Sequence, residues 1–332
     1  MNDLVCRLAT ELERDILLSL RTNEPLAPHT TLRVGGHADI FYSTASADDL
    51  AQVVAAAQRT GVPWLLLGGG SNICVSDRGF RGLVILNRCA ACDVGPATRV
   101  DTGHNLMSLF LKTARAGLSG LEFAVGIPGS VGGALVSNAG AYRHNIDALV
   151  RELDVVESGE RKTVPVDWME FSYRDTRLRK SGREPAAVVS VTLELTPRPR
   201  TDILARARDN QRQRIFKQPW NPSAGSFFKN VADPELAQIV PDLPAPLRES
   251  GVVPAGFLSQ ACGCKGMRVG GAAITGRHGN IFVNLGGATA ADFRRLAEMV
   301  KSRVRDKYGV ELEEEVLFLG EWTDWESREG AA

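Results

Sequence analysis

Hydrophobic and polar positions in the first half of the chain predict helices that alternate with short strands. Ser46 and Asp49 have the spacing of a capping box, and the apolar repeat after them predicts a helix through about residue 60. The apolar run "VPWLLL" (62–67) predicts a buried strand that leads into the turn "GGGSN", and "ICVSD" (73–77) predicts another short strand. Residues 103–117 have the pattern of a helix.

The second half of the chain continues this alternation. The run "AAVVSVTLEL" from residue 186 predicts a strand, and "TPRPRTDI" (196–203) has the proline and charge content of a connector. A later helix is predicted to begin at the cap formed by Thr289 and Asp292 and to end at Gly309. Its apolar positions follow helical spacing and are Phe293, Leu296, Val300 and Val304.

The composition is that of a soluble globular protein. The 332 residues are 44% hydrophobic, which suits two or three domains with a large core. Lys plus Arg and Asp plus Glu each total 39, so the net charge gives no argument for binding nucleic acid or an anionic membrane. Neither a signal peptide nor a run of membrane-spanning length is visible, and we expect a cytoplasmic protein.

Six cysteines occur without a secretion signal, which favours reduced thiols over a disulfide framework. Cys89 and Cys92 form one close pair in the sequence and Cys262 and Cys264 form another. The two pairs are far apart and no histidine cluster accompanies either, so small core or loop residues are favoured over a zinc site. We expect no metal.

Two glycine-rich loops, 68–72 and 126–140, are the first candidate binding features. "GGGSN" lacks the Lys-Ser/Thr of a P-loop and the G-x-G-x-x-G spacing of a Rossmann turn. Glycine lets amide N–H groups approach an anion without a Cβ in the way, and successive amides form a concave nest for phosphate. Either loop alone is equally well explained as a tight turn, but the two together favour the pyrophosphate of a dinucleotide.

Seven segments together resemble one family. In chain order they are "PLAPHTTLRVGG" (25–36), "LLGGGSNICVSDRGFRGLVI" (66–85), "GLSGLEFAVGIPGSVGGALVSNAGAY" (117–142), "FSYRDTRL" (171–178), "PSAGSFFKN" (222–230), "AGFLSQACGCKGMRVGGAAIT" (255–275) and "GVELEEEVLFLG" (309–320). This set is similar to the UDP-N-acetylenolpyruvoylglucosamine reductase family, also called UDP-N-acetylmuramate dehydrogenase. The resemblance covers about residues 21–320 and is far more selective than a single glycine loop.

The resemblance implies an α+β fold. A vanillyl-alcohol-oxidase-type FAD-binding fold of two subdomains is joined to an α/β substrate-binding domain. The expected domains are an N-terminal helical extension (1–20), FAD-binding subdomain 1 (21–86), FAD-binding subdomain 2 (87–205, with a C-terminal return at 316–332) and the substrate-binding domain (206–315). The predicted connector places the last boundary near 200–206.

The resemblance also implies non-covalent FAD, with the two glycine loops around its pyrophosphate. The positions expected to bind the cofactor are Gly68, Gly69, Gly70, Ser71, Asn72, Gly126, Ile127, Pro128, Gly129, Ser130, Gly132, Gly133, Asn138, Ala139 and Gly140. NADPH is the expected reductant. No separate Rossmann motif for NADPH is visible, which fits a site that NADPH and the substrate occupy in turn.

The family reaction reduces an enolpyruvyl ether to a lactyl ether during peptidoglycan precursor synthesis. Hydride addition to the terminal carbon leaves negative charge delocalised into the neighbouring carboxylate, so the site needs a cation and a proton donor. By resemblance, Arg174 in "YRDT" stabilises this enolate and Ser226 in "AGSFFKN" protonates it. Without the resemblance, Arg174 is better explained as a surface or ion-pairing residue and Ser226 as a turn or helix-cap serine.

Three consecutive glutamates, Glu313 to Glu315, lie in a stretch (310–320) that the pattern predicts to be a strand. In a strand Glu314 faces away from the other two, so spacing alone does not select the functional carboxylate, and a solvated acidic edge explains the run equally well. The family motif reads Leu-Glu-Pro-Glu-Val, which places the catalytic glutamate at Glu315 and Glu314 at the usual proline.

Three further positions resemble substrate-binding residues of the family. Lys217 and Asn230 match positions that hold the substrate diphosphate, and Tyr173 is expected beside the substrate, although an exposed loop charge and a core aromatic are ordinary alternatives. One subclass closes a loop with an added tyrosine over the substrate. The segment 175–215 has no tyrosine, so the chain resembles the shorter subclass.

The sequence departs from the family pattern in the expected substrate domain. There, Gln260-Ala-Cys-Gly263 replaces "EQAG" and His278-Gly-Asn-Ile281 replaces "HANF". Outside that domain, Arg143 occupies a position where the family usually has glycine. A paralogue that reduces a related nucleotide-linked enolpyruvyl sugar is therefore an alternative, as are another flavin oxidase of this fold and a non-catalytic nucleotide-sugar binding protein. We expect a monomer or weak oligomer.

Overall fold

The computed structural model describes residues 3–215 and 220–322, which form two compact units built from interleaved chain segments. Unit 1 comprises the described residues of Met1–Glu24, Ala38–Gly69 and Arg81–Phe216, and unit 2 those of Pro25–His37, Gly70–Phe80 and Lys217–Ala332. No helix within 3–215 or 220–322 has both the length and the apolar character needed to span a membrane.

The first sheet of unit 1 has four strands in the order β1-β2-β5-β3. Helix α3 (Ala47–Thr60) supplies much of the core behind it and begins at Ser46, whose hydroxyl accepts the Asp49 amide as the sequence predicts. Two short N-terminal helices pack into the same core cluster. The other elements are α1 (Asp3–Leu8), α2 (Arg14–Ser19), β1 (Arg21–Pro25), β2 (His37–Thr44), β3 (Trp64–Leu67) and β5 (Phe80–Asn87).

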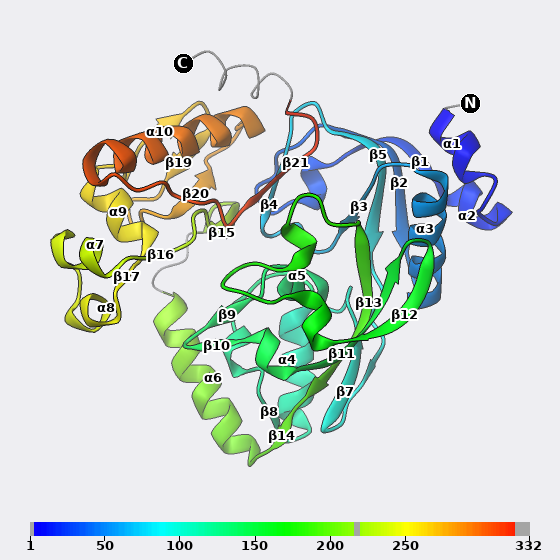
Figure 1. The fold of residues 1–332 in the computed structure, drawn as a ribbon, viewed down its shortest axis with the longest axis horizontal. Helices are drawn as coiled ribbons and strands as arrows, with labels where there is room; N and C mark the ends of the chain where they lie inside the picture. The colour runs from blue at the N-terminus through cyan, green and yellow to red at the C-terminus, as the bar shows by residue number, and fades with distance from the viewer. Residues whose placement is uncertain (1–2, 216–219, 323–332) are drawn as a thin grey trace. The chain divides into compact units, whose positions relative to one another are not determined.

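The second sheet of unit 1 is antiparallel, with five strands in the order β12-β11-β13-β7-β6 (Figure 1). Two short strand pairs, β9 with β10 and β8 with β14, connect its surrounding loops. The strands are β6 (Cys92–Asp93), β7 (Ala97–Asp101), β8 (Leu118–Ser119), β9 (Gly140–Ala141), β10 (His144–Asn145), β11 (Val150–Glu157), β12 (Glu160–Pro165), β13 (Ala186–Glu194) and β14 (Thr196–Pro197). The helices are α4 (Leu106–Arg115), α5 (Val131–Val136), α6 (Arg200–Ile215) and the short 3₁₀ segments η2 (Glu122–Ala124), η3 (Ile146–Leu149), η4 (Val166–Met169) and η5 (Arg177–Arg179).

Unit 2 is built on a four-stranded sheet in the order β15-β20-β19-β18 (Figure 1). Helix α10 (Ala290–Tyr308) fills the core on one side of this sheet, begins at the predicted Thr289–Asp292 capping box and ends at Gly309 in the left-handed conformation. Strand β4 (Ile73–Val75) pairs in parallel with β21 (Leu317–Leu319). The remaining elements are η1 (Ala27–His29), β15 (Ser223–Ser226), β16 (Val231–Ala232), α7 (Pro234–Ile239), α8 (Ala245–Ser250), β17 (Val252–Val253), α9 (Ala255–Ala261), β18 (Arg268–Val269), β19 (Ala272–Ile274) and β20 (Ile281–Asn284).

The local structure of two stretches differs from the simplest interpretation of the sequence. The stretch 196–203, predicted as a connector, is partly helical, because helix α6 begins at Arg200 and the Pro199 carbonyl accepts the amides of its first turn. Proline here precedes the helix, where its missing N–H costs nothing. Residues 310–320 are not one strand, since only β21 is regular and the glutamates before it pair their backbone with the segment after β15.

Candidate functional site

The two glycine loops lie against each other in unit 1. A Cβ added at Gly68 would lie 2.3 Å from the Ser130 hydroxyl oxygen, and one at Gly69 would lie 2.9 Å from the Gly129 Cα. Both distances are too short for a side chain, so glycine is required by space and not by backbone angle. The contact brings together two loops that the sequence predicts to act as one site.

The second loop is held in shape by its own hydrogen bonds. The Val131 amide donates to the His104 carbonyl at 2.9 Å, and the Gly132 amide donates to the Thr102 carbonyl at 2.8 Å. Ser130 caps α5 by accepting the Gly133 amide. Because these amides are satisfied inside the protein, the loop is preorganised before any ligand binds.

His104, which supports this loop, is a buried neutral imidazole. Its side chain is 3% exposed, and one ring nitrogen lies 3.0 Å from the Lys112 ammonium. Burial, together with the charge of Lys112, lowers the pKa of His104 below its usual value. Nothing in the local sequence pattern around His104 predicts that its carbonyl contacts the glycine loop.

Glu122 is the acidic residue at the start of the same glycine-rich stretch, and it is fully engaged. Its carboxylate accepts the Ser119 hydroxyl at 2.6 Å and the Gly120 amide at 2.7 Å, and Arg206 of helix α6 lies 3.6 Å away. Burial alone would raise the pKa of Glu122, but these donors and Arg206 hold it below the usual range. The carboxylate therefore ties the loop entrance to α6.

Gly70, Ser71 and Asn72, the rest of the first glycine loop, belong to unit 2. Gly70 has a φ of 61°, and a Cβ there would lie 2.1 Å from the His29 carbonyl oxygen, so both conformation and space require glycine. The Asn72 side-chain amide donates to the Glu315 carbonyl at 3.0 Å. A residue predicted to bind the cofactor is thus also in contact with the predicted catalytic glutamate.

Arg174 sits in a tight turn that docks on the segment 138–140. Its guanidinium donates to the Asn138 carbonyl at 3.1 Å and to the Gly140 carbonyl. The Asn138 side chain in turn donates to the Ser172 carbonyl at 2.9 Å, which closes a ring of contacts around the turn. Ala139 is buried behind these residues. Arg174 and this part of the predicted cofactor site therefore lie together in unit 1.

The backbone around Arg174 is strained. Arg174 itself has a φ of 53°, and Asn138, Tyr142 and Arg143 have φ values of 41°, 56° and 64°. Left-handed backbone is uncommon outside glycine, and it gathers at functional sites. The angle at Arg143 gives a physical reason for the usual family glycine there. Tyr173 is 53% exposed, with its ring 5.5 Å from the Arg174 guanidinium carbon.

Ser226 and Glu315 are brought together in unit 2. Ser226 ends strand β15, and the carbonyl of the next residue, Phe227, accepts the Glu315 amide at 2.9 Å. Ser226 is exposed and Glu315 is half-buried, so both side chains can meet a ligand. Arg174 belongs to unit 1.

The structure distinguishes the three glutamates by their partners. Glu313 forms an ion pair with the buried Lys229. Glu314 pairs with Lys301 at 3.1 Å and Arg294 at 3.9 Å, both on helix α10. The first two glutamates therefore stabilise the fold of unit 2. The choice of Glu315 as the candidate for chemistry comes from its position in the family motif.

The expected substrate-binding residues of this unit are only partly described. Asn230 is exposed, and its side-chain oxygen accepts the Ala255 amide at 3.3 Å. Lys217 lies outside the described residues. The departures from the family pattern pack on one another: a Cβ at Gly279 would lie 2.7 Å from the Gly256 carbonyl oxygen and 3.2 Å from the Gln260 nitrogen. An alanine at position 279 would not fit without movement of α9.

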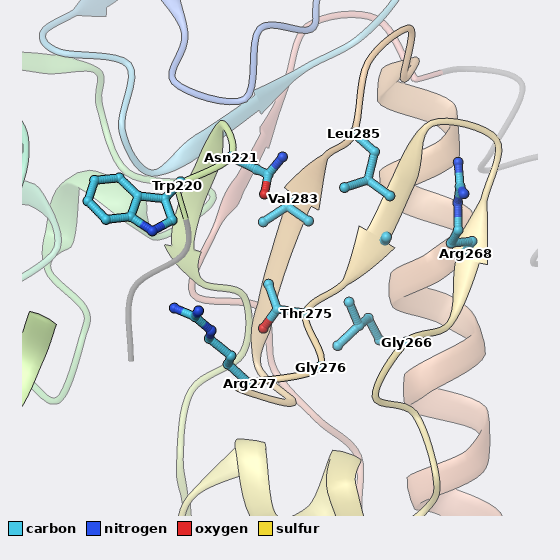
Figure 2. Close-up of a pocket in the computed structure, with 11 residues that line it drawn as sticks. Trp220, Asn221, Gly266, Arg268, Thr275, Gly276, Arg277, Val283 and Leu285 are labelled. Carbon is cyan, nitrogen blue, oxygen red and sulfur yellow. The ribbon is translucent and has the colours of Figure 1, made fainter. Parts of the chain in front are cut away.

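Unit 2 also contains an open cavity of about 390 Å³ on the side of the sheet away from α10 (Figure 2). Trp220 and Asn221 line one side of it and Arg268 the other, with Arg277 below. Trp220 is 95% exposed. Of the predicted site residues that the structure describes, none lines this cavity.

Two family models match the chain. The C-terminal domain of UDP-N-acetylenolpyruvoylglucosamine reductase matches residues 217–319, and an FAD binding domain matches residues 38–163. The reductase of this name from Geobacter metallireducens is 39% identical over 326 residues, covering 97% of this chain and 100% of that protein. The chain belongs to the UDP-N-acetylenolpyruvoylglucosamine reductase family. The Bacillus subtilis reductase is 34% identical, with 95% of this chain and 98% of that protein covered.

A solved structure of the family confirms the predicted α+β fold. The UDP-N-acetylenolpyruvylglucosamine reductase from Thermus caldophilus matches with a TM-score of 0.71 and 33% identity, over 90% of this chain and 97% of that one. The fold is of the predicted vanillyl-alcohol-oxidase type, and the chain is an FAD-dependent oxidoreductase. Side chains at Gly68 and Gly69 would push the two loops apart, so glycine keeps them close together, which fits one FAD pyrophosphate site lined by both loops.

Proposed function

We propose that this chain reduces the enolpyruvyl ether of UDP-N-acetylglucosamine enolpyruvate to UDP-N-acetylmuramate, using NADPH. The carbon–carbon double bond gains a hydride at its terminal carbon and a proton at the other carbon, while NADPH is oxidised to NADP⁺. This activity is supported by family membership and by sequence similarity to reductases of this name over nearly the whole chain. The backbone contact that brings the Ser226 and Glu315 segments together also supports it.

FAD, when bound, carries the two electrons between NADPH and the substrate. Residues of the chain then stabilise the negative charge of the enolate and donate the proton. Ser226 delivers the proton to the carbon that does not receive hydride, and Glu315 orients the reacting group beside it. The carbonyl of Phe227, the residue after Ser226, accepts the Glu315 amide, so the backbone segments that carry these two side chains are hydrogen-bonded neighbours. Tyr173, Lys217 and Asn230 bind the nucleotide sugar in this proposal.

Arg174 is proposed to stabilise the enolate. Its planar guanidinium suits a carboxylate, and its contacts with the Asn138 and Gly140 carbonyls fix the plane of the fork. Held in a left-handed turn, the side chain loses little further freedom when substrate binds. These features support a role in charge stabilisation rather than in surface ion pairing.

The experiment is anaerobic stopped-flow spectroscopy of the holoenzyme. Flavin is reduced with NADPH, NADP⁺ is removed, and UDP-N-acetylglucosamine enolpyruvate is added while the oxidised flavin band is followed. We expect rapid reoxidation with formation of UDP-N-acetylmuramate, slowed at least 100-fold in Ser226→Ala, a typical size for removal of a general acid. Ser223→Ala on the same strand is the matched control and keeps the wild-type rate.

Reduced flavin that persists after this substrate is added would contradict the proposed substrate. The packed departures at Gln260 and Gly279 then favour the second candidate, a related nucleotide-linked enolpyruvyl sugar. Turnover with NADH at the same efficiency would contradict the assignment of NADPH. The proposal places the reaction in the cytoplasm, where the nucleotide sugar is made, and treats the protein as a monomer or weak oligomer.

A further inference from the structure

We propose that Asn280 is a positioning residue that sets the spacing of Ser226 and Glu315, an inference that rests on the function proposed above. Asn280 is 3% exposed and lies immediately before strand β20. Its side-chain oxygen accepts the Phe228 amide at 2.9 Å, and its side-chain nitrogen donates to the Phe228 carbonyl at 2.8 Å. The side-chain amide of Asn280 thus forms hydrogen bonds with both the backbone N–H and the backbone C=O of the buried Phe228.

The main chain of Asn280 extends this clamp toward Ser226. Its carbonyl accepts the Phe227 amide at 2.8 Å, and its neighbour Ile281 is the strand partner of Ser226. Asn280 therefore contacts two consecutive residues directly after the proposed proton donor. The segment cannot slide along β20 without breaking all three hydrogen bonds.

The clamped segment also holds the glutamate. The Phe227 carbonyl accepts the Glu315 amide, and Phe228 forms a β-bridge with Glu314. The peptide units fixed by Asn280 on one side therefore bind the glutamate segment on the other. A shift of Phe227 would move Ser226 and Glu315 relative to each other, and misplacement of about 1 Å costs an enzyme on the order of 100-fold in rate.

Asn284, at the end of the same strand, is a natural comparison. It is 7% exposed and also uses its side chain to bind backbone, donating to the Leu32 carbonyl at 2.9 Å and accepting the Gly286 amide at 2.8 Å. These partners do not adjoin Ser226 or Glu315 in the chain. Comparison of variants at Asn280 and Asn284 therefore distinguishes a role in positioning the reacting groups from a role in stabilising unit 2.

The experiment measures both half-reactions of the holoenzyme in Asn280→Ala and Asn284→Ala. We expect Asn280→Ala to slow substrate-dependent flavin reoxidation by about 10- to 100-fold. Flavin reduction by NADPH stays within about 2-fold, because it needs no proton from Ser226. Asn284→Ala leaves both rates near wild type although its melting temperature falls by a similar amount.

Equal slowing in the two variants, or equal slowing of both half-reactions in Asn280→Ala, would overturn the proposal. If the wild-type enzyme itself is not reoxidised by the enolpyruvyl substrate, the proposed function fails first. Hydrogen exchange of the Phe228 amide distinguishes the two failures: fast exchange in Asn280→Ala and slow exchange in Asn284→Ala establish the clamp, whatever the substrate.

Asn280→Asp provides a second test if the alanine variant does not fold. An ionised aspartate accepts the Phe228 amide but cannot donate to the Phe228 carbonyl, whereas a protonated one can do both. We therefore expect reoxidation by Asn280→Asp to recover relative to wild type as the pH is lowered. A constant ratio of the two rates across pH would contradict the clamp.

Discussion

The side-chain amide of Asn72 donates a hydrogen bond to the Glu315 carbonyl across 243 positions of sequence. The Asn72 carbonyl accepts the Leu317 amide in turn, so Asn72 is hydrogen-bonded to the residues on both sides of Val316. Together with the Phe227 contact, this fixes the main chain of Glu315 at its amide and at its carbonyl. The first glycine loop is consequently part of the support of Glu315, the proposed catalytic carboxylate.

Replacement of Asn72 tests this relationship. Because the side chain is engaged with Glu315, we expect Asn72→Ala to retain FAD at about one equivalent and to slow substrate-dependent flavin reoxidation about 10-fold. Flavin content is measured from the absorbance of the purified protein, and reoxidation by stopped flow. Protein purified without flavin would instead assign the side chain to the cofactor, as the sequence analysis predicts.

Gly69→Ala is expected to weaken FAD binding by at least 10-fold. The added Cβ meets the Gly129 Cα at 2.9 Å, and because both atoms are attached to backbone, one loop must move. The measurement is a titration of apoprotein with FAD, followed by quenching of flavin fluorescence. Gly95→Ala is the matched control, since its nearest neighbour, the Ala97 carbonyl oxygen, is 4.0 Å away. Equal affinities of the two variants would show that the loop contact is dispensable.

Arg143→Gly is expected to stabilise the protein relative to Arg143→Ala. The residue has a φ of 64°, which costs a residue with a Cβ about 1 kcal/mol, and both variants remove the same guanidinium. We expect the glycine variant to have the higher free energy of unfolding by about 0.5–1 kcal/mol, measured with chemical denaturant. If alanine is the more stable of the two, the left-handed backbone is not a source of strain.

Glu122→Gln is expected to lower the free energy of unfolding by about 1–3 kcal/mol at neutral pH, since it replaces a buried carboxylate that has two hydrogen-bond donors and an ion pair with Arg206. The folded pKa of Glu122 lies below its usual value, so its contribution is complete above the unfolded pKa of about 4.3 and is lost as the pH falls through the folded pKa.

Denaturation from pH 7 to pH 3 measures this dependence. The difference between wild type and Glu122→Gln should shrink on acidification. Glu170→Gln is the control, because it removes a half-exposed carboxylate whose two ion pairs are weakened by solvent screening. A difference for Glu122→Gln that stays constant across this range would contradict the assigned pKa shift.

The sequence predicts those elements whose signals are local. Ser46 and Thr289 each cap a helix through a residue three positions later, and both helices are confirmed. Pro199 does not show whether a helix follows, because a proline that precedes a helix and a proline in a connector have the same local sequence. Glu313 to Glu315 were assigned to a strand because their actual partners, from Phe227 to Lys229, lie more than 80 positions earlier.

In the candidate site, too, the sequence predicts features that depend on local signals and misses those that depend on long-range contacts. Gly70 is required by its own φ and by contact with His29, and the motif containing it was identified directly. The side chains of Asn72 and Asn280 gain their roles only from backbone groups 243 and 52 positions away. No periodicity or spacing in the sequence encodes such contacts, so only the folded chain connects them with Ser226 and Glu315.

The parallel pairing of β4 with β21 has a consequence for the order of events during biosynthesis. Residues 73–75 are translated well before their partner strand, 317–319. Unit 2 therefore stays incomplete until residues 317–319 are made, even though its first segments are made before much of unit 1. A prematurely terminated chain would lack this strand and expose an open sheet edge, the kind of surface that quality-control proteases and chaperones recognise.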